Sequence, residues 1–482
     1  MNLKFELTKT ILSYGVATGQ LVAGSIRDNL IYTFQQWNED EDRELYNAKF
    51  GDIEKIAIET GKGWTVNGKL FLKNIENTNR HYAVFGNTGS FKSTTIVSQL
   101  LNASGQCFLI HDPSGNLANI SARYLQRKGY RVFLLDFNDP DYSCGINLLD
   151  FITCESDAGK LASHLVRNSL GDKASDPFWT ISSVSILRLL ICAVLKLEPK
   201  FRTMKNVQQL LFALAAKKQD LKPIVVKSLS DTQFAEFVSL VKGNEKTLSS
   251  IIMTCQAALE LFNNESVARI TSQSTIRFED FRKQPTALFI KNSTLDATFI
   301  RPILSVVIEN AIKVFMNRLP QPGERQVLLI LDECSTLKLD SLELVLANAR
   351  KNNIGFCCMY QHPGQVISHL GKDAGASLLS NCYSKLFLTS DLDTSKHLED
   401  LLGRRTITDE KGRTKTEPLL PAQRIRSLKT NEGIFLHGAL PPFKLKIYPY
   451  FEQHYLRLRA SDEEYRGDEN AIPKTPAILK LQ

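Results

Sequence analysis

The sequence lacks the features that mark disulfide-stapled, zinc-binding or membrane-spanning proteins. Its nine cysteines form no C-x-x-C pair and most lie in apolar runs, so we expect free thiols in a reducing compartment. The N-terminus has no signal-peptide layout. Residues 11–26, the nearest approach to a membrane span, are too few and include Gln20 and three glycines. We therefore expect a cytoplasmic protein with no intrinsic transmembrane segment.

Charge and composition are not extreme either. The 59 Lys and Arg residues exceed the 51 Asp and Glu residues by eight, which permits a nucleic-acid partner without arguing for one. An apolar fraction of 43% and a charged fraction of 23% exclude a mainly disordered, collagen-like or coiled-coil chain. At roughly 150 residues per domain, the length suggests about three domains.

Short apolar runs alternate with helical periodicity in two separate parts of the chain. The expected strands are residues 81–86, 106–112, 130–137, 286–291, 326–333, 355–360 and 384–389. Strands separated by helices predict an α/β fold with a mainly parallel sheet. Residues 155–270 show only helical spacing, which predicts an inserted all-α domain.

A phosphate-binding motif follows the first of these strands. The segment GNTGSFKST matches G-x-x-x-x-G-K-[ST] at its first glycine, its lysine and its serine. The candidate nucleotide-binding residues are Gly86, Asn87, Thr88, Gly89, Ser90, Phe91, Lys92, Ser93 and Thr94. Backbone N–H groups would point at phosphate oxygens, Lys92 would reach the β- and γ-phosphates, and Ser93 would bind Mg²⁺.

The motif has one departure and one competing interpretation. Phe91 occupies the place of the second motif glycine, where the backbone takes a conformation that a side chain disfavours. The competing interpretation is a glycine-rich turn around a surface lysine.

A second candidate element ends the apolar strand at residues 327–333. Asp332 would help to hold Mg²⁺ and Glu333 would orient and activate the attacking water. The alternative is a buried strand that ends in a solvated acidic pair.

Two further candidates follow from geometry. Arg350 lies near the end of a predicted helix over residues 340–352, about 15 Å along the axis from Asp340. If this helix leads away from the carboxylates, Arg350 is badly placed for its own γ-phosphate and could serve a neighbouring subunit. The alternative is an arginine that favours the helix dipole. Gln361 ends the next strand and could lie beside the two carboxylates, because ligands bind at this edge of parallel sheets. Its alternative is a polar loop residue.

Beyond these motifs, the chain resembles the type IV secretion coupling proteins, the hexameric conjugation ATPases of the TraG/TraD kind. The similarity covers roughly residues 80–455 and depends on an ordered set of segments. These are DPSGNL (112–117), GINLLDFI (145–152), DPFW (176–179), the block 331–361, LEDLLGRRTI (398–407) and IFLHGALPPFKLKIYPYF (434–451).

The resemblance implies a RecA-like P-loop NTPase core in a hexameric ring, with ATP and Mg²⁺ as cofactors. It implies ATP hydrolysis, stimulated by DNA, coupled to moving DNA or relaxase–DNA into a secretion channel. Lys92 and Ser93 would hold nucleotide and Mg²⁺, and Asp332 and Glu333 would be the Walker B pair. Arg350 would be a finger acting in trans, and Gln361 would link nucleotide state to movement.

The chain departs from the family pattern at three places. The usual pair of N-terminal transmembrane helices is not found, so contact with channel components at the inner membrane would replace them. Ser114 and Asn116 replace Lys and Glu, so their segment is assigned a structural role. Phe91 leaves the rate of turnover open.

Rival functions remain at this point. The chain could be a coupling ATPase that recruits protein effectors, or a nucleotide-binding docking adaptor with little turnover. A chromosome-partitioning or DNA-packaging translocase is disfavoured by the helical block. The basic clusters GRRT, RSLKT and Lys217-Lys218 could contact DNA, although a solvated face is the better interpretation of each.

The expected division of the chain follows from these assignments. It comprises an N-terminal helical or mixed segment (1–60), the first part of the nucleotide-binding domain (61–154), the all-α domain (155–270), the second part of the nucleotide-binding domain (271–458) and a flexible tail (459–482).

Overall fold

The computed structural model describes residues 47–87, 89–170, 177–292, 297–388, 391–408 and 413–481. The chain separates into two compact units. The larger comprises residues 52–391 and 428–482, and the smaller comprises residues 1–51 and 392–427. The stretch 11–26, Thr88 and Asp176 lie outside the described residues.

The larger unit is built on a nine-stranded sheet with the order β13-β12-β9-β3-β8-β7-β4-β6-β5. Its strands are β3 (Tyr82–Phe85), β4 (Cys107–His111), β5 (Arg131–Asp136), β6 (Thr286–Lys291), β7 (Val327–Leu331), β8 (Ile354–Tyr360), β9 (Ser384–Phe387), β12 (Glu432–His437) and β13 (Phe443–Lys446). Strands β3 to β9 pair in parallel, which confirms the predicted α/β fold. The antiparallel edge formed by β12 and β13 was not predicted.

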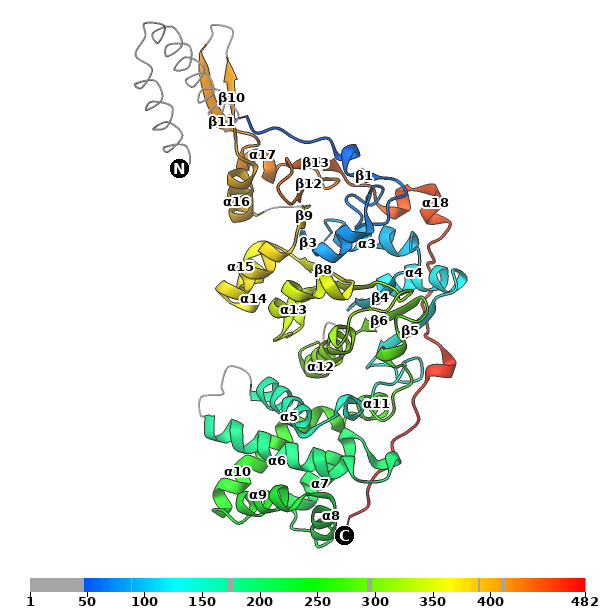
Figure 1. Ribbon diagram of the computed structural model, residues 1–482, viewed down its shortest axis with the longest axis vertical. Coiled ribbons are helices and arrows are strands. Elements are labelled where there is room, and N and C mark those ends of the chain that lie inside the picture. Colours follow the sequence, from blue (N-terminus) through cyan, green and yellow to red (C-terminus); the bar gives the residue numbers. More distant parts are fainter. Residues whose placement is uncertain are drawn as a thin grey trace, which may run out of the picture. The chain divides into compact units, whose positions relative to one another are not determined.

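Helices cover both faces of this sheet, as Figure 1 shows, with α3 and α4 on one side and α13, α14 and α15 on the other. Their bounds are α3 (Lys92–Leu101), α4 (Asn116–Arg127), α12 (Ala297–Met316), α13 (Leu342–Asn348), α14 (Pro363–Leu370) and α15 (Lys372–Asn381). Strands β3, β4, β7 and β8 are buried at every position. Burial on both faces explains why the sequence shows continuous apolar runs rather than alternation.

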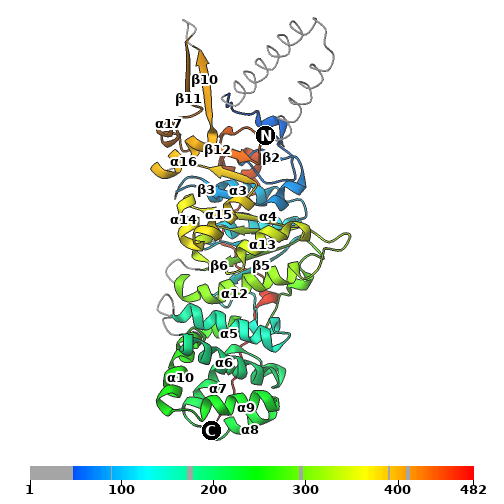
Figure 2. The ribbon, with the colours of Figure 1, turned by 60° about the vertical axis from the view of Figure 1, so that its left-hand side comes forward.

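A stack of helices follows β5 and lies beyond α12, as the two views in Figures 1 and 2 agree. It consists of α5 (Glu155–Leu170), α6 (Pro177–Leu195), α7 (Met204–Ala215), α8 (Leu221–Ser228), α9 (Asp231–Val241), α10 (Glu245–Leu259) and α11 (Glu265–Ile270). No strand occurs among the described residues between Glu155 and Ile270. In the described part of this stretch, the helical periodicity therefore corresponds to helices joined by short turns and loops.

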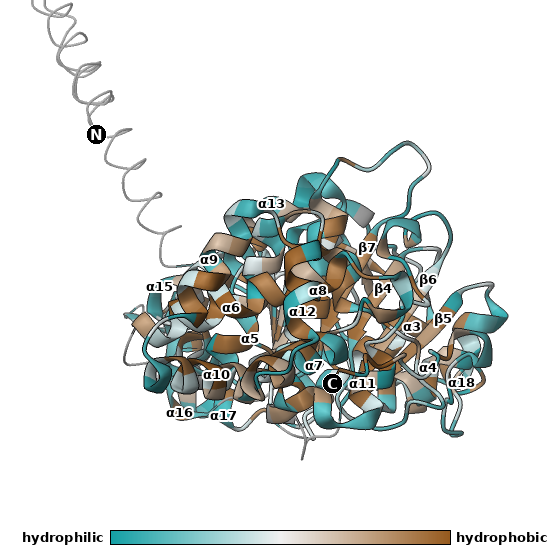
Figure 3. Cartoon of the chain, turned by 90° about the horizontal axis from the view of Figure 1, so that it is seen from below, coloured by the Kyte–Doolittle hydropathy of each residue, from teal (hydrophilic) through white to brown (hydrophobic). Residues whose placement is uncertain are grey.

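Helix α6 is apolar enough to be compared with a membrane span. Its window Phe178–Leu195 has a mean hydropathy of 2.0, and half of that window is buried within the protein. The sequence analysis named residues 11–26 as the nearest approach to a membrane span and did not single out this window. Within the described part of the chain, the window is long and apolar enough to qualify by length and composition. Figure 3 shows brown, hydrophobic positions along α6 and α12 and teal positions toward the outside. Packing against neighbouring helices accounts for the apolar character of α6, since a core helix is hydrophobic nearly all round.

The smaller unit carries an exposed hairpin. Strands β10 (Arg404–Thr408) and β11 (Thr414–Pro418) pair with each other in antiparallel fashion, between α16 (Leu392–Leu402) and α17 (Ala422–Arg426). Every residue of β10 is exposed. The sequence analysis did not predict this hairpin, because its residues are mainly basic and polar rather than alternately apolar.

All nine cysteines are free thiols, and seven of them are buried. Among these, burial raises the pKa of Cys382 to about 12, so its thiol stays protonated and unreactive. These residues act as small apolar side chains in the core.

The C-terminal residues form what we call the strap, residues 459–481, which follows α18 (His454–Arg457). Figure 1 shows it in red, passing β5 and α11 toward α7 and α8. Tyr465 Oη donates to Val132 O at 3.1 Å, and Leu479 N donates to Asn206 Oδ1 at 2.9 Å. The sequence predicted a flexible tail here, because polar and proline residues show no periodicity. Hydrogen bonds between side chains and main chain, contributed from both the strap and the body of the larger unit, hold it instead.

Two short strands and several single turns complete the larger unit. Strands β1 (Ala57–Ile58) and β2 (Phe71–Leu72) pair in antiparallel fashion before the main sheet begins. The boundaries of the domains expected from the sequence stay predictions.

Replacing Asn206 with alanine should release the end of the strap. The buried Asn206 amide accepts from Leu479 N and donates to Ala477 O at 2.8 Å, so its loss leaves backbone groups unpaired at a cost of about 1–3 kcal/mol. Hydrogen exchange at residues 477–479 should accelerate by at least about tenfold. Asn168→Ala is the control, because among the described residues its amide bonds only to His164 O in its own helix. Unchanged exchange in Asn206→Ala would show that other contacts hold the strap.

Candidate nucleotide-binding site

The loop after β3 is anchored to the neighbouring strand at its first residue. Gly86 N donates to Tyr360 O, the last residue of β8, at 3.2 Å. A Cβ atom on Gly86 would lie 2.3 Å from Ser90 Oγ and 3.1 Å from Leu388 Cβ, so a larger residue would force the loop to shift. Gly89 has φ of +80°, which also favours glycine. The loop ends at Lys92, where α3 begins.

Phe91 adopts the left-handed conformation that the motif glycine would adopt, with φ of 66°. Such a conformation costs a residue with a side chain roughly 1–2 kcal/mol. The Phe91 ring packs against the ring of Phe451, with centroids 6.1 Å apart. This packing compensates for the strain, so the loop keeps its turn although the second glycine is absent.

Lys92 and Ser93 place the two motifs in contact. Lys92 is buried, and its Nζ donates to Gly86 O at 2.5 Å and to Asn87 O at 3.4 Å. Ser93 Oγ donates to Asp332 Oδ2 at 2.8 Å. Burial raises the pKa of Asp332, and the Ser93 bond and the nearby Lys92 charge oppose that rise. The residues expected to bind phosphate and Mg²⁺ therefore form one cluster.

Glu333 and Gln361 also meet at this edge of the sheet. Gln361 Nε2 donates to Glu333 Oε1 at 3.1 Å. Gln361 N donates to Gln365 Oε1 at 2.8 Å, and Gln365 Nε2 donates to Ser335 Oγ at 3.0 Å. Glu333 has φ of 58°, a strained conformation of the kind that clusters at functional sites. A continuous series of hydrogen bonds thus connects the residues that follow β7 with those that follow β8.

Arg350 does not join this cluster. The predicted helix over 340–352 is shorter than expected, because α13 ends at Asn348 and a 3-10 turn, η9 (Ala349–Asn352), follows it. Arg350 therefore lies before the start of β8, whereas the phosphate loop lies after the parallel β3. The seven residues of β8 span about 20 Å at roughly 3.3 Å per residue. The exposed Arg350 therefore lies at the amino-terminal end of the parallel strands, whereas Lys92 lies at their carboxyl-terminal end. We call these two ends the opposite edges of the sheet.

Two buried residues beside Asp332 were missed as site residues. His111 Nδ1 donates to Asp332 O at 2.8 Å, and its Nε2 lies 3.2 Å from Asn292 Oδ1. Burial lowers the pKa of His111 to about 4, so the ring is neutral. Burial also raises the pKa of Asp112 to about 7, although its Oδ2 accepts from Ala118 N at 2.8 Å. The available signal was that β4, like β7, ends its apolar run in polar residues.

The basic clusters are partly engaged within the protein. Lys217 pairs with Glu245 at 2.6 Å, and Lys218 Nζ donates to Leu481 O at 2.6 Å. Arg405 pairs with Glu417 at 2.9 Å. These contacts favour a structural role for the residues named.

Comparison with known proteins identifies related sequences. A family model described as "Type IV secretory system Conjugative DNA transfer" matches residues 33–472. The chain is 23% identical to the conjugal transfer protein TraG of Escherichia coli over 448 residues, which are 84% of this chain and 69% of that protein. It is 23% identical to VirD4 of Agrobacterium fabrum (strain C58) over 392 residues, 75% of this chain and 57% of that protein.

Solved structures share the fold. The plasmid coupling protein TrwB, in complex with ADP and Mg²⁺, matches with a TM-score of 0.65 and 17% identity, over 89% of this chain and 97% of that chain. VirB4 of Thermoanaerobacter pseudethanolicus matches with a TM-score of 0.51 and 14% identity, over 85% of this chain and 100% of that chain. The likeness to TrwB confirms the predicted RecA-like core.

The role of the Phe91 ring can be separated from the role of its backbone. Phe91→Gly removes the strain together with the ring, so we expect ATP affinity within about threefold of wild type. Phe91→Ala keeps the strain and loses the packing, so the turn should shift, with about tenfold weaker binding for roughly 1–2 kcal/mol of strain. Titration with a fluorescent ATP analogue measures both. Equal ATP affinities of Phe91→Gly and Phe91→Ala would show that the ring does not hold the turn. Phe451→Ala removes the partner ring, so it should also weaken ATP binding.

Proposed function

Because the chain belongs to the type IV secretory system conjugative DNA transfer family, we propose that it is an ATP-hydrolysing coupling protein. It binds DNA or a relaxase–DNA substrate and drives or gates transfer into a type IV secretion channel. The observation that carries the proposal is the bond between Ser93 and Asp332, 2.8 Å long, which joins the two halves of a nucleotide site.

The residues present fit ATP and Mg²⁺. The Ser93 hydroxyl and the Asp332 carboxylate are oxygen ligands of the kind that Mg²⁺ prefers. Bound Mg²⁺ would neutralise charge that develops on the phosphates. The Lys92 ammonium now bonds to loop carbonyls, and it would exchange these for phosphate oxygens at the same loop. The fold relative TrwB, at 17% identity, is known in complex with ADP and Mg²⁺.

Hydrolysis needs a base that is held in position. Glu333 would accept a proton from the attacking water, and Gln361 restrains the carboxylate by donating to Oε1 at 3.1 Å. Because the backbone N–H of Gln361 donates to Gln365 Oε1, a movement after β8 would shift Gln361 and so reorient Glu333. This is the physical basis for assigning Gln361 to the coupling of nucleotide state and movement.

A ring of identical copies completes the site. Arg350 is at the opposite edge from Lys92 of the same chain, so in a hexamer it would reach the phosphates held by a neighbour. We place the assembly on the cytoplasmic side of the inner membrane, held there by channel components. Recruitment of protein effectors is the rival within the class. A docking adaptor without turnover is the rival outside it, and the intact turn at Phe91 counts against that function.

Changing the candidate base should separate binding from hydrolysis. We expect Glu333→Gln to bind ATP as wild type does but to lose turnover by at least about 100-fold, because the carboxylate is the proton acceptor. Lys92→Ala should weaken binding itself. Steady-state hydrolysis with and without single- and double-stranded DNA is the measurement, and DNA should stimulate the wild type. Turnover of Glu333→Gln equal to wild type would defeat the assignment; binding without turnover by the wild type would favour the adaptor.

The position of Arg350 predicts complementation between inactive variants. Arg350→Ala should keep nucleotide affinity and lose hydrolysis by about 10³-fold, the scale of arginine-finger effects. Rings assembled from Arg350→Ala and Glu333→Gln together should regain activity, because some sites then contain an intact base and an intact neighbouring arginine. Lys351→Ala, which alters the next exposed cation of η9, should match wild type. An inactive mixture would mean that Arg350 does not act in trans.

A further inference from the structure

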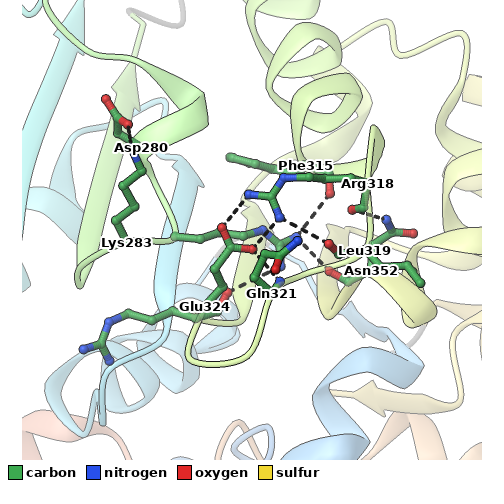
Figure 4. A network of polar contacts seen from close by, with 10 residues as sticks. Asp280, Lys283, Phe315, Arg318, Leu319, Gln321, Glu324 and Asn352 are labelled. Carbon is green, nitrogen blue, oxygen red and sulfur yellow. Dashed lines mark hydrogen bonds and ion pairs between the residues drawn. The ribbon is translucent and has the colours of Figure 1, made fainter.

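A buried cation lies behind the segment that carries Arg350. Arg282, between η7 (Phe278–Asp280) and β6, is 6% exposed. Its Nη2 donates to Asn352 O at 2.7 Å and to Phe315 O at 3.3 Å, and its Nη1 lies 3.4 Å from Arg325 O. Across the described ranges, all of its hydrogen-bond acceptors are main-chain carbonyls. Figure 4 shows this network.

Burying an arginine at such a site costs free energy, which has to be offset by the hydrogen bonds that the guanidinium makes there. Burial lowers the pKa of Arg282, and desolvating a guanidinium is costly when no carboxylate bonds to it. The planar fork can nevertheless fix several carbonyls at once. Arg282 therefore joins three separate segments, the end of α12, the start of β7 and η9.

Asn352, the last residue of η9, is held through its main-chain carbonyl and its side-chain amino group. Its carbonyl accepts from Arg282, and its Nδ2 donates to Arg318 O at 2.9 Å and to Met316 O at 3.3 Å. Asn353 N donates back to Arg350 O at 3.1 Å. The backbone at the end of η9 is thus fixed two and three residues beyond Arg350.

The loop that receives these bonds is itself braced. Arg318 forms a two-pronged pair with Glu324 at 2.8 and 2.6 Å, and Gln321 N donates to the same carboxylate at 2.8 Å. The Arg318 pair holds the pKa of Glu324 at about 2. Arg325 N donates to Arg282 O at 3.1 Å, so both the main chain and the side chain of Arg282 belong to the brace.

We propose that Arg282, through Asn352, is a positioning residue for Arg350. The inference rests on the proposed function, in which Arg350 acts on nucleotide held by a neighbouring copy. The Arg350 side chain is exposed, and no hydrogen bond or ion pair holds it among the residues that the structure describes. Its placement therefore depends on the backbone of η9. A displacement of about 1 Å at a reacting centre can cost on the order of 100-fold in rate.

The test compares Arg282→Gln, Arg282→Lys and Arg350→Ala by steady-state ATP hydrolysis. We expect Arg282→Gln to lower kcat at least tenfold with KM for ATP within twofold of wild type, because Lys92 is at the other edge of the sheet. Arg282→Lys should be intermediate, since an ammonium cannot reproduce the fork. The double variant Arg282→Gln/Arg350→Ala should be no slower than Arg350→Ala. Rings assembled from Arg282→Gln and Glu333→Gln together should regain activity. Arg269→Gln, which loses a bond to Pro473 O elsewhere, is the control.

Each contrary result has a distinct meaning. Arg282→Gln with wild-type kcat, beside an inactive Arg350→Ala, overturns the positioning role and leaves the proposed function intact. An active Arg350→Ala overturns the role of Arg350 in the proposed function and, with it, the inference, whereas an ATPase that fails the Glu333→Gln test overturns the proposed function itself. A raised KM, or a further fall in the double variant, shows a general structural role and also overturns the inference. Should Arg282→Gln not fold, Asn352→Ser replaces it in the same assays, because it removes only the two bonds made by Nδ2.

Discussion

The bond between Ser93 and Asp332 depends on where three strands lie. Strand β8 separates β3 from β7, so the loops that follow β3 and β7 open at the same edge, two strand spacings or about 10 Å apart. Side chains from both loops can bridge that gap. The continuous apolar strands, the parallel pairing and the helices on both faces all serve to hold β3 and β7 at this separation.

Two residues with a strained backbone flank that bond. Phe91 and Glu333 both have positive φ, at 66° and 58°, and each is secured by a neighbour, Phe451 for the first and Gln361 for the second. A conformation that costs about 1–3 kcal/mol persists only where its surroundings fix it. The consequence is that aromatic packing performs at position 91 the task that glycine performs by having no side chain.

The sequence predicted those parts of the structure in which the pattern of apolar residues along the chain matches the pattern of burial. The parallel strands were located because each is apolar throughout, and the meeting of Gln361 with Glu333 followed from the common edge of parallel strands. The strap was missed because Leu479 and Asn206, which hold it, are 273 residues apart and any polar side chain can bond to a backbone group. His111 was missed for a similar reason, since its partner is the carbonyl of Asp332. The roles of these residues in catalysis stay predictions.

In the proposed ring, the two ends of the parallel strands would divide the site between copies of the chain. Arg350 lies about 20 Å from its own phosphate loop, by the length of β8, so it would act as a finger in a head-to-tail interface that closes into a ring. Such an interface would transmit a displacement of η9 to the neighbouring nucleotide. An apolar side chain at position 282 would avoid the cost of desolvating a cation, but it could not hold Asn352, Phe315 and Arg325 by their carbonyls. Under the proposed positioning role, the buried guanidinium trades stability for the precision that a site shared between copies would require.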